Sequence, residues 1–305
     1  MGAIIPADPR RDRAALPASD APDSTGTLYV IATPIGHLGD LSPRAAELLG
    51  RVPVIAAEDT RTSQKLVPSR AIPPHWIALH DHNEARAAER VLDHLRAGDD
   101  VALVSDAGTP LVSDPGYRLV DGAHAAGLAV LPVPGPCAAI AALSASGLAS
   151  DRFAFEGFLP AKAGARRKRL AALAEAPHTL IFYVPARDLV GVLGDLAEAF
   201  GAERPGCVAR ELTKRFEQVR RDGLAALAEW TAADPDRQRG EAVVLVAGAP
   251  GTDGATASKV TASALADALA GELPPARAAR VIRALTGLPR ADAFALVEAR
   301  RERES

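Results

Sequence analysis

Apolar runs and helical patterns alternate along the first half of the chain. The first apolar run, Thr27–Thr33, predicts a strand that ends at a proline. Ser42 and Pro43 then predict a helix start, because serine caps the free N–H groups and proline suits the first turn. An amphipathic pattern over Glu84–Ala97 predicts a second helix. Further strands are predicted at Val52–Ala56, Ile77–His80, Val101–Ser105 and Leu128–Val133. This alternation favours an α/β domain with a mainly parallel sheet.

The second half repeats apolar runs of strand length and then changes character. The predicted elements are strands at Thr179–Val184, Gly206–Arg210 and Ala242–Ala247, and helices at Lys168–Glu175 and Asp188–Phe200. Small residues over Gly248–Ser258 indicate a linker. Helical patterns at about 260–270, 275–286 and 290–303 follow, and the last two resemble a helix-turn-helix with Gly287 at the turn. A small helical appendage packed on the body is the simpler interpretation.

These patterns divide the chain into four parts. Residues 1–25 combine Pro, Asp, Arg and Ala without periodicity, which indicates a disordered tail. An N-terminal α/β domain over 26–148 is expected to hold loops for a ligand and the substrate side. A C-terminal α/β domain over 149–250 and a helical extension over 258–305 complete the division.

Composition limits the classes of function. The chain has 305 residues, 48% of them apolar, and a formal net charge of −3. Nucleic-acid binding would therefore need a local basic patch. Two cysteines are too few for a disulfide scaffold or a zinc cluster and indicate buried thiols in a reducing cytosol. We expect no transmembrane span, because no apolar run approaches about 18 residues, and no signal peptide, because the N-terminus lacks an apolar core.

Three loops rich in glycine and proline follow strand ends in the first half. They are TPIGHLGDLS (Thr33–Ser42), SDAGTPLVSDPG (Ser105–Gly116) and PGPCAA (Pro134–Ala139). Ligands of parallel sheets bind beyond the carboxyl ends of the strands, and glycine lets a backbone approach a ligand closely. Together these loops predict one shared site. Neither a dinucleotide fingerprint nor a P-loop is present, so nicotinamide and nucleoside triphosphates are weak candidates.

Polar residues also stand at two other strand ends. Glu58, Asp59 and Arg61 follow one strand, in a pattern that fits either a site or an acid–arginine pair that stabilises the loop. His80 follows the next strand in the sequence ALHDHNEA. We expect no metal there, because no third ligand stands at a telling spacing and Asn83 resembles a helix N-cap.

A basic run spans the start of the predicted helix at Lys168–Glu175. Lys162, Arg166, Arg167 and Arg169 lie in the sequence GFLPAKAGARRKRL. A solvated helix start is the usual interpretation of such a run. Cations in a first turn oppose the helix dipole, however, and an anionic partner such as an RNA phosphate would offset that cost.

Eight motifs occur together and in order along the chain. They read LYVIATPIGHLGDLSPRA, IAAEDTR, LHDHNE, ALVSDAGTPLVSDPGYRLV, VPGPCAAIAALSASGL, FAFEGFLPAK, LIFY and ARELTK. As a set they resemble the bacterial family of 16S ribosomal RNA 2′-O-ribose (cytidine) methyltransferases, a branch of the tetrapyrrole-methylase-like, class III S-adenosylmethionine enzymes. The resemblance covers roughly Gly26 to Ala247.

The resemblance implies two α/β domains with S-adenosylmethionine in the cleft between them, and a cytoplasmic homodimer that needs no metal. It implies methylation of a cytidine ribose in the decoding region of the small ribosomal subunit. Two segments depart from the family pattern, since His37 replaces an asparagine and Phe182–Asp188 reads FYVPARD. The residues that match the family's cofactor loops are Ile35, Asp106, Gly108, Thr109, Val112, Pro136, Cys137, Tyr183 and Leu212.

Methyl transfer to a ribose hydroxyl requires alignment and is helped by a general base. Glu58, Asp59 and His80 are the predicted polar candidates, and Arg61 is predicted to hold a phosphate by a forked contact. The basic run from Lys162 to Arg169 is the predicted RNA-binding patch. The alternatives are a tetrapyrrole methyltransferase, which shares the fold, and a non-catalytic RNA-binding factor of the ribosome.

Overall fold

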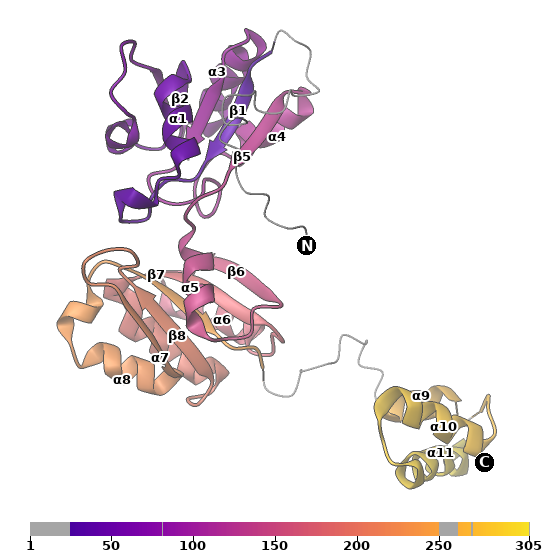
Figure 1. Cartoon of the computed structure of the whole chain (residues 1–305). Helices are drawn as coiled ribbons and strands as arrows, with labels where there is room; N and C mark the ends of the chain where they lie inside the picture. Colours follow the sequence, from indigo (N-terminus) through magenta and orange to yellow (C-terminus); the bar gives the residue numbers. More distant parts are fainter. Residues whose placement is uncertain (1–24, 81, 250–261, 270, 305) are drawn as a thin grey trace. The chain divides into compact units, whose positions relative to one another are not determined.

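The computed structural model describes residues 25–80, 82–249, 262–269 and 271–304. Residues 1–24 of the predicted tail and most of the predicted linker lie outside this range. The chain forms two compact units, Met1–Ala249 and Pro250–Ser305 (Figure 1). Within the described residues, the first unit contains two sheets and the second contains three helices.

The first sheet is fully parallel and has the strand order β3-β2-β4-β1-β5. The parallel sheet expected from the alternating pattern is therefore present, with strand boundaries shifted by up to two residues. Its strands are β1 (Thr27–Ile31), β2 (Val54–Ala57), β3 (His75–Ala78), β4 (Val101–Val104) and β5 (Ala129–Val133).

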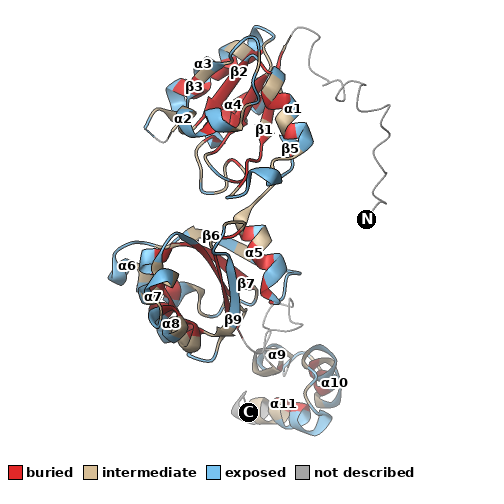
Figure 2. Ribbon diagram, turned by 60° about the vertical axis from the view of Figure 1, so that its left-hand side comes forward, coloured by how far each residue is buried: buried red, intermediate tan, exposed pale blue. Residues whose placement is uncertain are grey.

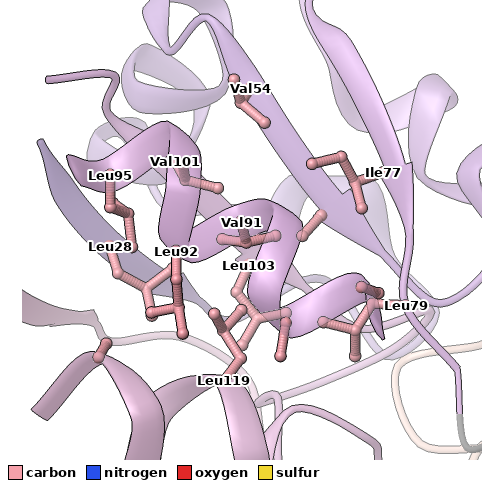
Figure 3. Close-up of a cluster of buried hydrophobic side chains, with 14 of the residues drawn as sticks. Leu28, Val54, Ile77, Leu79, Val91, Leu92, Leu95, Val101, Leu103 and Leu119 are labelled. Atoms are coloured by element: carbon pink, nitrogen blue, oxygen red, sulfur yellow. The ribbon is translucent and has the colours of Figure 1, made fainter. Parts of the chain in front are cut away.

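Helices cover both faces of this sheet because alternate strand residues point to opposite sides. Leu28 packs under α3 and α4, within the apolar cluster that Figure 3 shows. Tyr29, the next residue, packs on the other face against α1. The helical segments of this part are η1 (Leu38–Asp40), α1 (Pro43–Arg51), α2 (Thr60–Ser63), η2 (Gln64–Leu66), α3 (Glu84–Arg96) and α4 (Tyr117–Ala125).

The predicted N-cap residues of α1 and α3, Ser42 and Asn83, make different hydrogen bonds. Ser42 caps α1 by accepting a hydrogen bond from the Ala45 N–H at 3.1 Å, which confirms the predicted start. Asn83 stands at the N-cap position of α3 but makes no capping bond. Its side-chain oxygen instead accepts from the His80 N–H at 2.9 Å, so Asn83 orders the loop before the helix.

The second sheet is mixed and has the order β6-β7-β10-β8-β9. Only β6 and β7 run parallel, and the other neighbours are antiparallel. Extending a mainly parallel arrangement to this half would therefore be wrong. The edge strands β6 and β9 were not predicted, because both are largely exposed and show no buried apolar run. The strands are β6 (Phe153–Phe158), β7 (Thr179–Pro185), β8 (Pro205–Arg210), β9 (Gln218–Gly223) and β10 (Glu241–Val246).

Helices also cover both faces of the second sheet. Residues of α6, α7 and α8 pack on one face, and α5 packs on the other. The boundary expected near residue 148 places α5 in the first domain, whereas its apolar side contacts the second sheet. The prediction placed the start of the next helix at Lys168, whereas α6 begins earlier in the chain, at Ala163. The helical segments are α5 (Ala138–Ser146), α6 (Ala163–Leu173), η3 (Ala186–Asp188), α7 (Leu189–Phe200), α8 (Leu224–Ala232) and η4 (Pro235–Gln238).

The three predicted C-terminal helices are present as α9 (Ala262–Leu269), α10 (Pro275–Thr286) and α11 (Arg290–Glu304). Gly287 ends α10 in the left-handed conformation at φ 72°, as the turn position requires. These helices enclose a small apolar core of their own, which includes Ala278, Ile282 and Val297. Figure 2 shows buried residues inside both sheets and a thinner buried stripe inside the helical unit.

Candidate functional site

Hydrogen bonds join the three glycine- and proline-rich loops to one another. The N–H of Thr33 donates to Gly108 O at 2.8 Å, and the N–H of Gly108 donates to Thr33 O at 3.1 Å. The hydroxyl of Thr109 donates to Pro136 O at 2.9 Å. Loops separated by about 30 to 75 residues are thus tied at the carboxyl ends of β1, β4 and β5. The structure brings together the loops that were expected to share a site.

These loops form part of a cavity of about 450 Å³. Its other wall comes from β7, β8, β10 and the loop that follows β8. Seven of the nine predicted cofactor residues line it: Ile35, Asp106, Gly108, Thr109, Val112, Tyr183 and Leu212. The remaining two, Pro136 and Cys137, directly precede the lining residue Ala138.

Gly108 shows why this wall needs a glycine. Its φ of +87° lies in the left-handed region, which L side chains rarely adopt. A Cβ at this position would stand 3.4 Å from Ile35 Cγ2 and 3.8 Å from Pro136 O. A larger side chain would therefore extend among the lining residues, where a ligand would lie.

Strained backbone gathers in two loops beside the cavity. Among the described residues, the non-glycine positions with positive φ are Leu111, Ser113, Glu211 and Thr213. Two of them, Ser113 and Glu211, line the cavity. Such conformations persist only where the surrounding structure holds them, and they concentrate at ligand sites. The strain therefore supports a ligand site in this cavity.

The Glu211 carboxylate is held by two donors. The Glu241 N–H donates to its Oε1 at 3.0 Å, and Lys214 Nζ donates to the same atom at 3.1 Å. Burial alone would raise the pKa of Glu211, but these hydrogen bonds outweigh it and hold the pKa below its ordinary value. Glu211 and Lys214 both belong to the motif ARELTK, but the sequence analysis named only Leu212 of that motif as a site residue.

The loop after β1 contacts the loop after β8. The His37 N–H donates to Thr213 Oγ1 at 3.1 Å, and a Cβ on Gly36 would stand 2.6 Å from the same oxygen. The imidazole of His37 accepts from the Gly39 N–H at 3.0 Å. The departure from asparagine at His37 thus provides a local cap for η1, and the backbone contact to Thr213 does not depend on the side chain.

Tyr183 anchors the apolar side of the cavity. Its hydroxyl accepts from the Ala139 N–H at 3.3 Å, and the rings of Phe155 and Phe158 lie 4.8 and 5.6 Å from its own. Burial, followed by the neighbouring Cys137, raises the pKa of Tyr183. The phenol therefore stays protonated at neutral pH. Sequence reasoning missed Phe158, which lies in the unpredicted edge strand β6 and also lines the cavity.

Glu58, Asp59 and Arg61 lie at the carboxyl end of β2, next to a lining residue of the cavity. The Asp59 N–H donates to Asp106 Oδ1 at 3.0 Å. The Asp59 carboxylate caps α2 through the Arg61 N–H at 2.8 Å and pairs with the Arg61 guanidinium at 3.2 Å. The Arg61 side chain is 88% exposed, so the pair lies at the surface and is not a buried stabilising pair.

Two of the three predicted bases of this region, Asp59 and His80, differ in their surroundings. The hydrogen bond from Arg61 lowers the pKa of Asp59, which weakens that carboxylate as a base. His80, which follows β3 at the same edge of the sheet, has a buried Nδ1 without a hydrogen-bond partner in the structure. Its ring lies 6.1 Å from that of His82. The hydrogen bonding of the Asp59 carboxylate therefore argues against Asp59 as the base.

The basic run on α6 is largely neutralised within the protein. Arg166 Nε contacts Asp195 Oδ2 at 2.6 Å, and Arg167 Nε contacts Asp195 Oδ1 at 2.8 Å. Arg169 pairs with Glu156. The anionic partners that offset cations in the first two turns are therefore residues of α7 and β6. Arg166 is only 13% exposed, which leaves Lys162, Arg167 and Arg169 as the accessible predicted RNA contacts.

Replacing Asp195 by asparagine should destabilise the first unit. Burial alone would raise the pKa of Asp195, but the bonds from Arg167 and Arg166 hold it below its ordinary value, so Asp195 is charged at neutral pH. Loss of these charged bonds should lower the free energy of unfolding by about 2 kcal/mol in urea denaturation. Glu198→Gln, which removes a partner 3.8 Å from Arg167, is the control and should change little. Equal stability of the two variants would contradict a structural role.

The destabilisation should depend on pH in a defined direction. Because the pKa of Asp195 is depressed in the folded state, its contribution is present above the unfolded pKa and disappears as the pH falls through the folded pKa. The difference between Asp195→Asn and the parent should therefore shrink in acid.

The described residues offer neither a metal site nor a membrane-spanning helix. No group of three or more His, Cys, Asp or Glu residues in the described ranges is arranged to hold a metal ion. None of the helices that the structure describes is long and apolar enough to cross a membrane. Of the two cysteines, Cys207 is fully buried, and burial raises its pKa to about 11, whereas Cys137 is partly exposed.

Comparison with known sequences identifies close relatives. The profile of the family described as Tetrapyrrole (Corrin/Porphyrin) Methylases matches residues 27–228. Ribosomal RNA small subunit methyltransferase I of Pseudomonas aeruginosa is 52% identical over 265 residues, which cover 87% of this chain and 94% of the relative. The protein of the same name from Mesorhizobium japonicum is 47% identical over 262 residues, covering 85% and 87%.

Comparison with solved structures identifies the same fold. The methyltransferase CobJ aligns with a TM-score of 0.54 at 22% identity, over 74% of this chain and 95% of CobJ. A uroporphyrin-III C-methyl transferase from Thermus thermophilus, complexed with S-adenyl homocysteine, aligns with a TM-score of 0.50 at 21% identity. That alignment covers 73% of this chain and 97% of the other. At these identities the comparison supports the fold.

Proposed function

The chain belongs to the ribosomal RNA small subunit methyltransferase I family within the tetrapyrrole methylases, and we propose that it methylates 16S ribosomal RNA. The methyl donor is S-adenosylmethionine, and the acceptor is the 2′-hydroxyl of a cytidine ribose in the decoding region of the small subunit. The enzyme acts as a cytoplasmic homodimer and uses no metal.

The cavity beside the three loops is the observation that carries this proposal. Its volume of about 450 Å³ falls within the range of small-molecule sites. Ile35, Val112 and Leu212 provide apolar walls that suit a purine ring. Asp106 and Asp114 place carboxylates where ribose hydroxyls and a cationic ligand need acceptors. The cavity therefore matches S-adenosylmethionine in volume and in the charge of its walls, and the glycine at position 108 lets the backbone come close to the ligand.

Position, more than chemical activation, is what the protein must supply. When bound, S-adenosylmethionine contributes an activated methyl group. The loops around Gly108 and Leu212 hold the donor in one orientation, which is worth much of the rate in a displacement reaction. His80 or Glu58 removes the proton of the ribose hydroxyl, and Arg61 binds an adjacent phosphate through its exposed guanidinium.

RNA contacts extend beyond this site in the proposal. Lys162, Arg167 and Arg169 on and before α6 are exposed and can each donate hydrogen bonds to a phosphate, Arg167 and Arg169 in addition to their acidic partners. Arg166 has a structural role and supports the group through Asp195. Because phosphate contacts release counterions, binding through this patch weakens with rising salt.

Methyl transfer from labelled S-adenosylmethionine tests the function directly. The acceptors are small ribosomal subunits, free 16S RNA and a tetrapyrrole. We expect label only in RNA, at a cytidine whose ribose then resists alkaline cleavage on its 3′ side. Label in the tetrapyrrole alone would overturn the proposal in favour of the alternative activity of this fold. Cofactor binding without transfer to any of the three would favour a non-catalytic RNA-binding factor.

Thiol alkylation tests the placement of the cofactor. Iodoacetamide should modify Cys137 and leave Cys207 unmodified, because only Cys137 is accessible. Saturating S-adenosylhomocysteine should slow the modification of Cys137 by about tenfold, since a ligand in a pocket excludes solvent from its walls. Peptide mass spectrometry at several times gives both rates. An unchanged Cys137 rate in protein that binds the ligand by calorimetry would remove Cys137 from the site.

A further inference from the structure

One side of α10 in the C-terminal unit carries a row of arginines. Arg277, Arg280 and Arg283 are all exposed, and we call these three residues the arginine face. The opposite side of the helix, with Ala278 and Ile282, is buried in the core of the unit. Residues three apart lie on neighbouring positions of a helix surface, so the three guanidinium groups project from one side.

The arginine face has no acidic residue within its own helix. The sequence of α10, PARAARVIRALT, contains neither Asp nor Glu. Among side chains that the structure describes, no ion pair involves Arg277, Arg280 or Arg283. This differs from α6, where Arg166, Arg167 and Arg169 have acidic partners. Arg277 also lies in the first turn, where a cation opposes the helix dipole.

The dimensions and chemistry of the arginine face match a phosphate backbone. Arg283 lies six positions after Arg277, which corresponds to about 9 Å along a helix axis. Arg290, exposed at the start of α11, adds a fourth cation after the turn at Gly287. Guanidinium groups bind phosphate oxygens through forked pairs of hydrogen bonds. A partner with closely spaced phosphates can therefore engage several of these cations together.

We propose that the arginine face, none of whose residues lines the cavity, is a second RNA-binding surface, which retains the ribosomal RNA substrate on the enzyme. This inference rests on the proposed function for the identity of the RNA. The helical unit, Pro250–Ser305, lies beyond residues 27–228, which match the methylase family. Two binding surfaces on one chain raise the effective concentration of the substrate at the second surface.

Charge removal from the arginine face in the full-length protein provides the test. The variant Arg277→Gln, Arg280→Gln, Arg283→Gln keeps good helix formers at exposed positions, so α10 should persist. The slope of log affinity for 16S RNA against log salt concentration should fall by about two, because roughly 0.7 to 0.9 of a counterion is released per phosphate contact. The KM for RNA should rise roughly tenfold, with kcat and S-adenosylmethionine affinity unchanged.

A matched control removes the same number of exposed charges elsewhere. Arg86→Gln, Arg90→Gln, Arg152→Gln alters exposed arginines of the first unit and should leave the salt slope close to that of the parent. Circular dichroism and melting curves of both variants check that each is folded. An equal loss of slope in the two variants would show a general charge effect and overturn the proposal.

Other outcomes separate this inference from the proposed function. A parental salt slope and KM in the α10 variant would overturn the inference while methylation by the parent still supports the function. If the α10 variant bound assembled subunits less well but free RNA as well as the parent does, the arginine face would bind an acidic ribosomal protein. That result would also overturn the inference. If the parent methylates no RNA, the proposed function fails, and the RNA-binding slopes still decide the inference by themselves.

Discussion

Gly108→Leu should abolish binding of S-adenosylmethionine and, with it, methylation. A leucine side chain would enter the cavity from a Cβ that already lies 3.4 Å from Ile35 Cγ2. We expect the affinity to fall by about a hundredfold or more, which corresponds to about 3 kcal/mol. Isothermal titration calorimetry of the folded variant measures this change, and transfer of labelled methyl to RNA reports the loss of activity.

The effect of backbone strain at residue 108 must be distinguished from the effect of a side chain that fills the cavity. Gly108 has a φ of +87°, at which any side chain is unfavourable. Gly127 offers a matched control: its φ is +67°, and a Cβ there would meet no atom within 4 Å. Gly127→Leu should therefore lose about 1 to 2 kcal/mol of stability from the left-handed conformation but bind the cofactor normally. Parental affinity in a folded Gly108→Leu protein would remove this loop from the site.

Arg61→Ala should lower turnover strongly while leaving the fold intact. The side chain is exposed and its pair with Asp59 lies at the surface, so its removal should change the melting temperature very little. Loss of a phosphate contact would misplace the acceptor ribose, and kcat/KM for RNA should fall by about a hundredfold. Affinity for S-adenosylmethionine should be unchanged, because Arg61 is not among the residues that line the cavity.

Asp59→Asn refines the same test. Asparagine also caps helices well, so α2 should remain, while the negative charge that orients Arg61 is lost. We expect a smaller loss of turnover than for Arg61→Ala. Arg96→Ala is a suitable control because Arg96 makes a similar surface pair with Asp93 at 2.9 Å on α3. Full activity of Arg61→Ala with a normal melting curve would exclude the proposed role, whereas joint loss of activity, stability and cofactor affinity would assign this pair to structure.

Much of the first sheet and its loops could be predicted from local sequence alone. Thr27–Thr33 and Val101–Ser105 are continuous apolar runs because both faces of these strands are covered, and glycines and prolines mark where the strands end. The motif set in the same loops predicted the tetrapyrrole-methylase fold, and the comparisons confirm it. The catalytic roles of Glu58, Asp59, Arg61 and His80 remain predictions.

The second sheet was less predictable because its edges carry little pattern. The strand β9, Gln218–Gly223, is largely exposed and contains three charged residues, so it lacks the apolar positions that indicate a strand. Its place is decided by pairing with β8, which no local pattern encodes. The antiparallel direction of β10 likewise follows from its two neighbours in the sheet.

The sequence by itself determined where the chain turns, where backbone approaches a ligand, and which positions are buried, since these depend on residue type and local spacing. Only the tertiary structure decided which charges are available. Arg166 and Arg280 are indistinguishable as arginines in basic helical segments, yet Arg166 is paired with Asp195, 29 residues away, and Arg280 is paired with none of the described acidic side chains. An ion pair forms through proximity in space, and packing of α6 against α7 creates that proximity for Arg166.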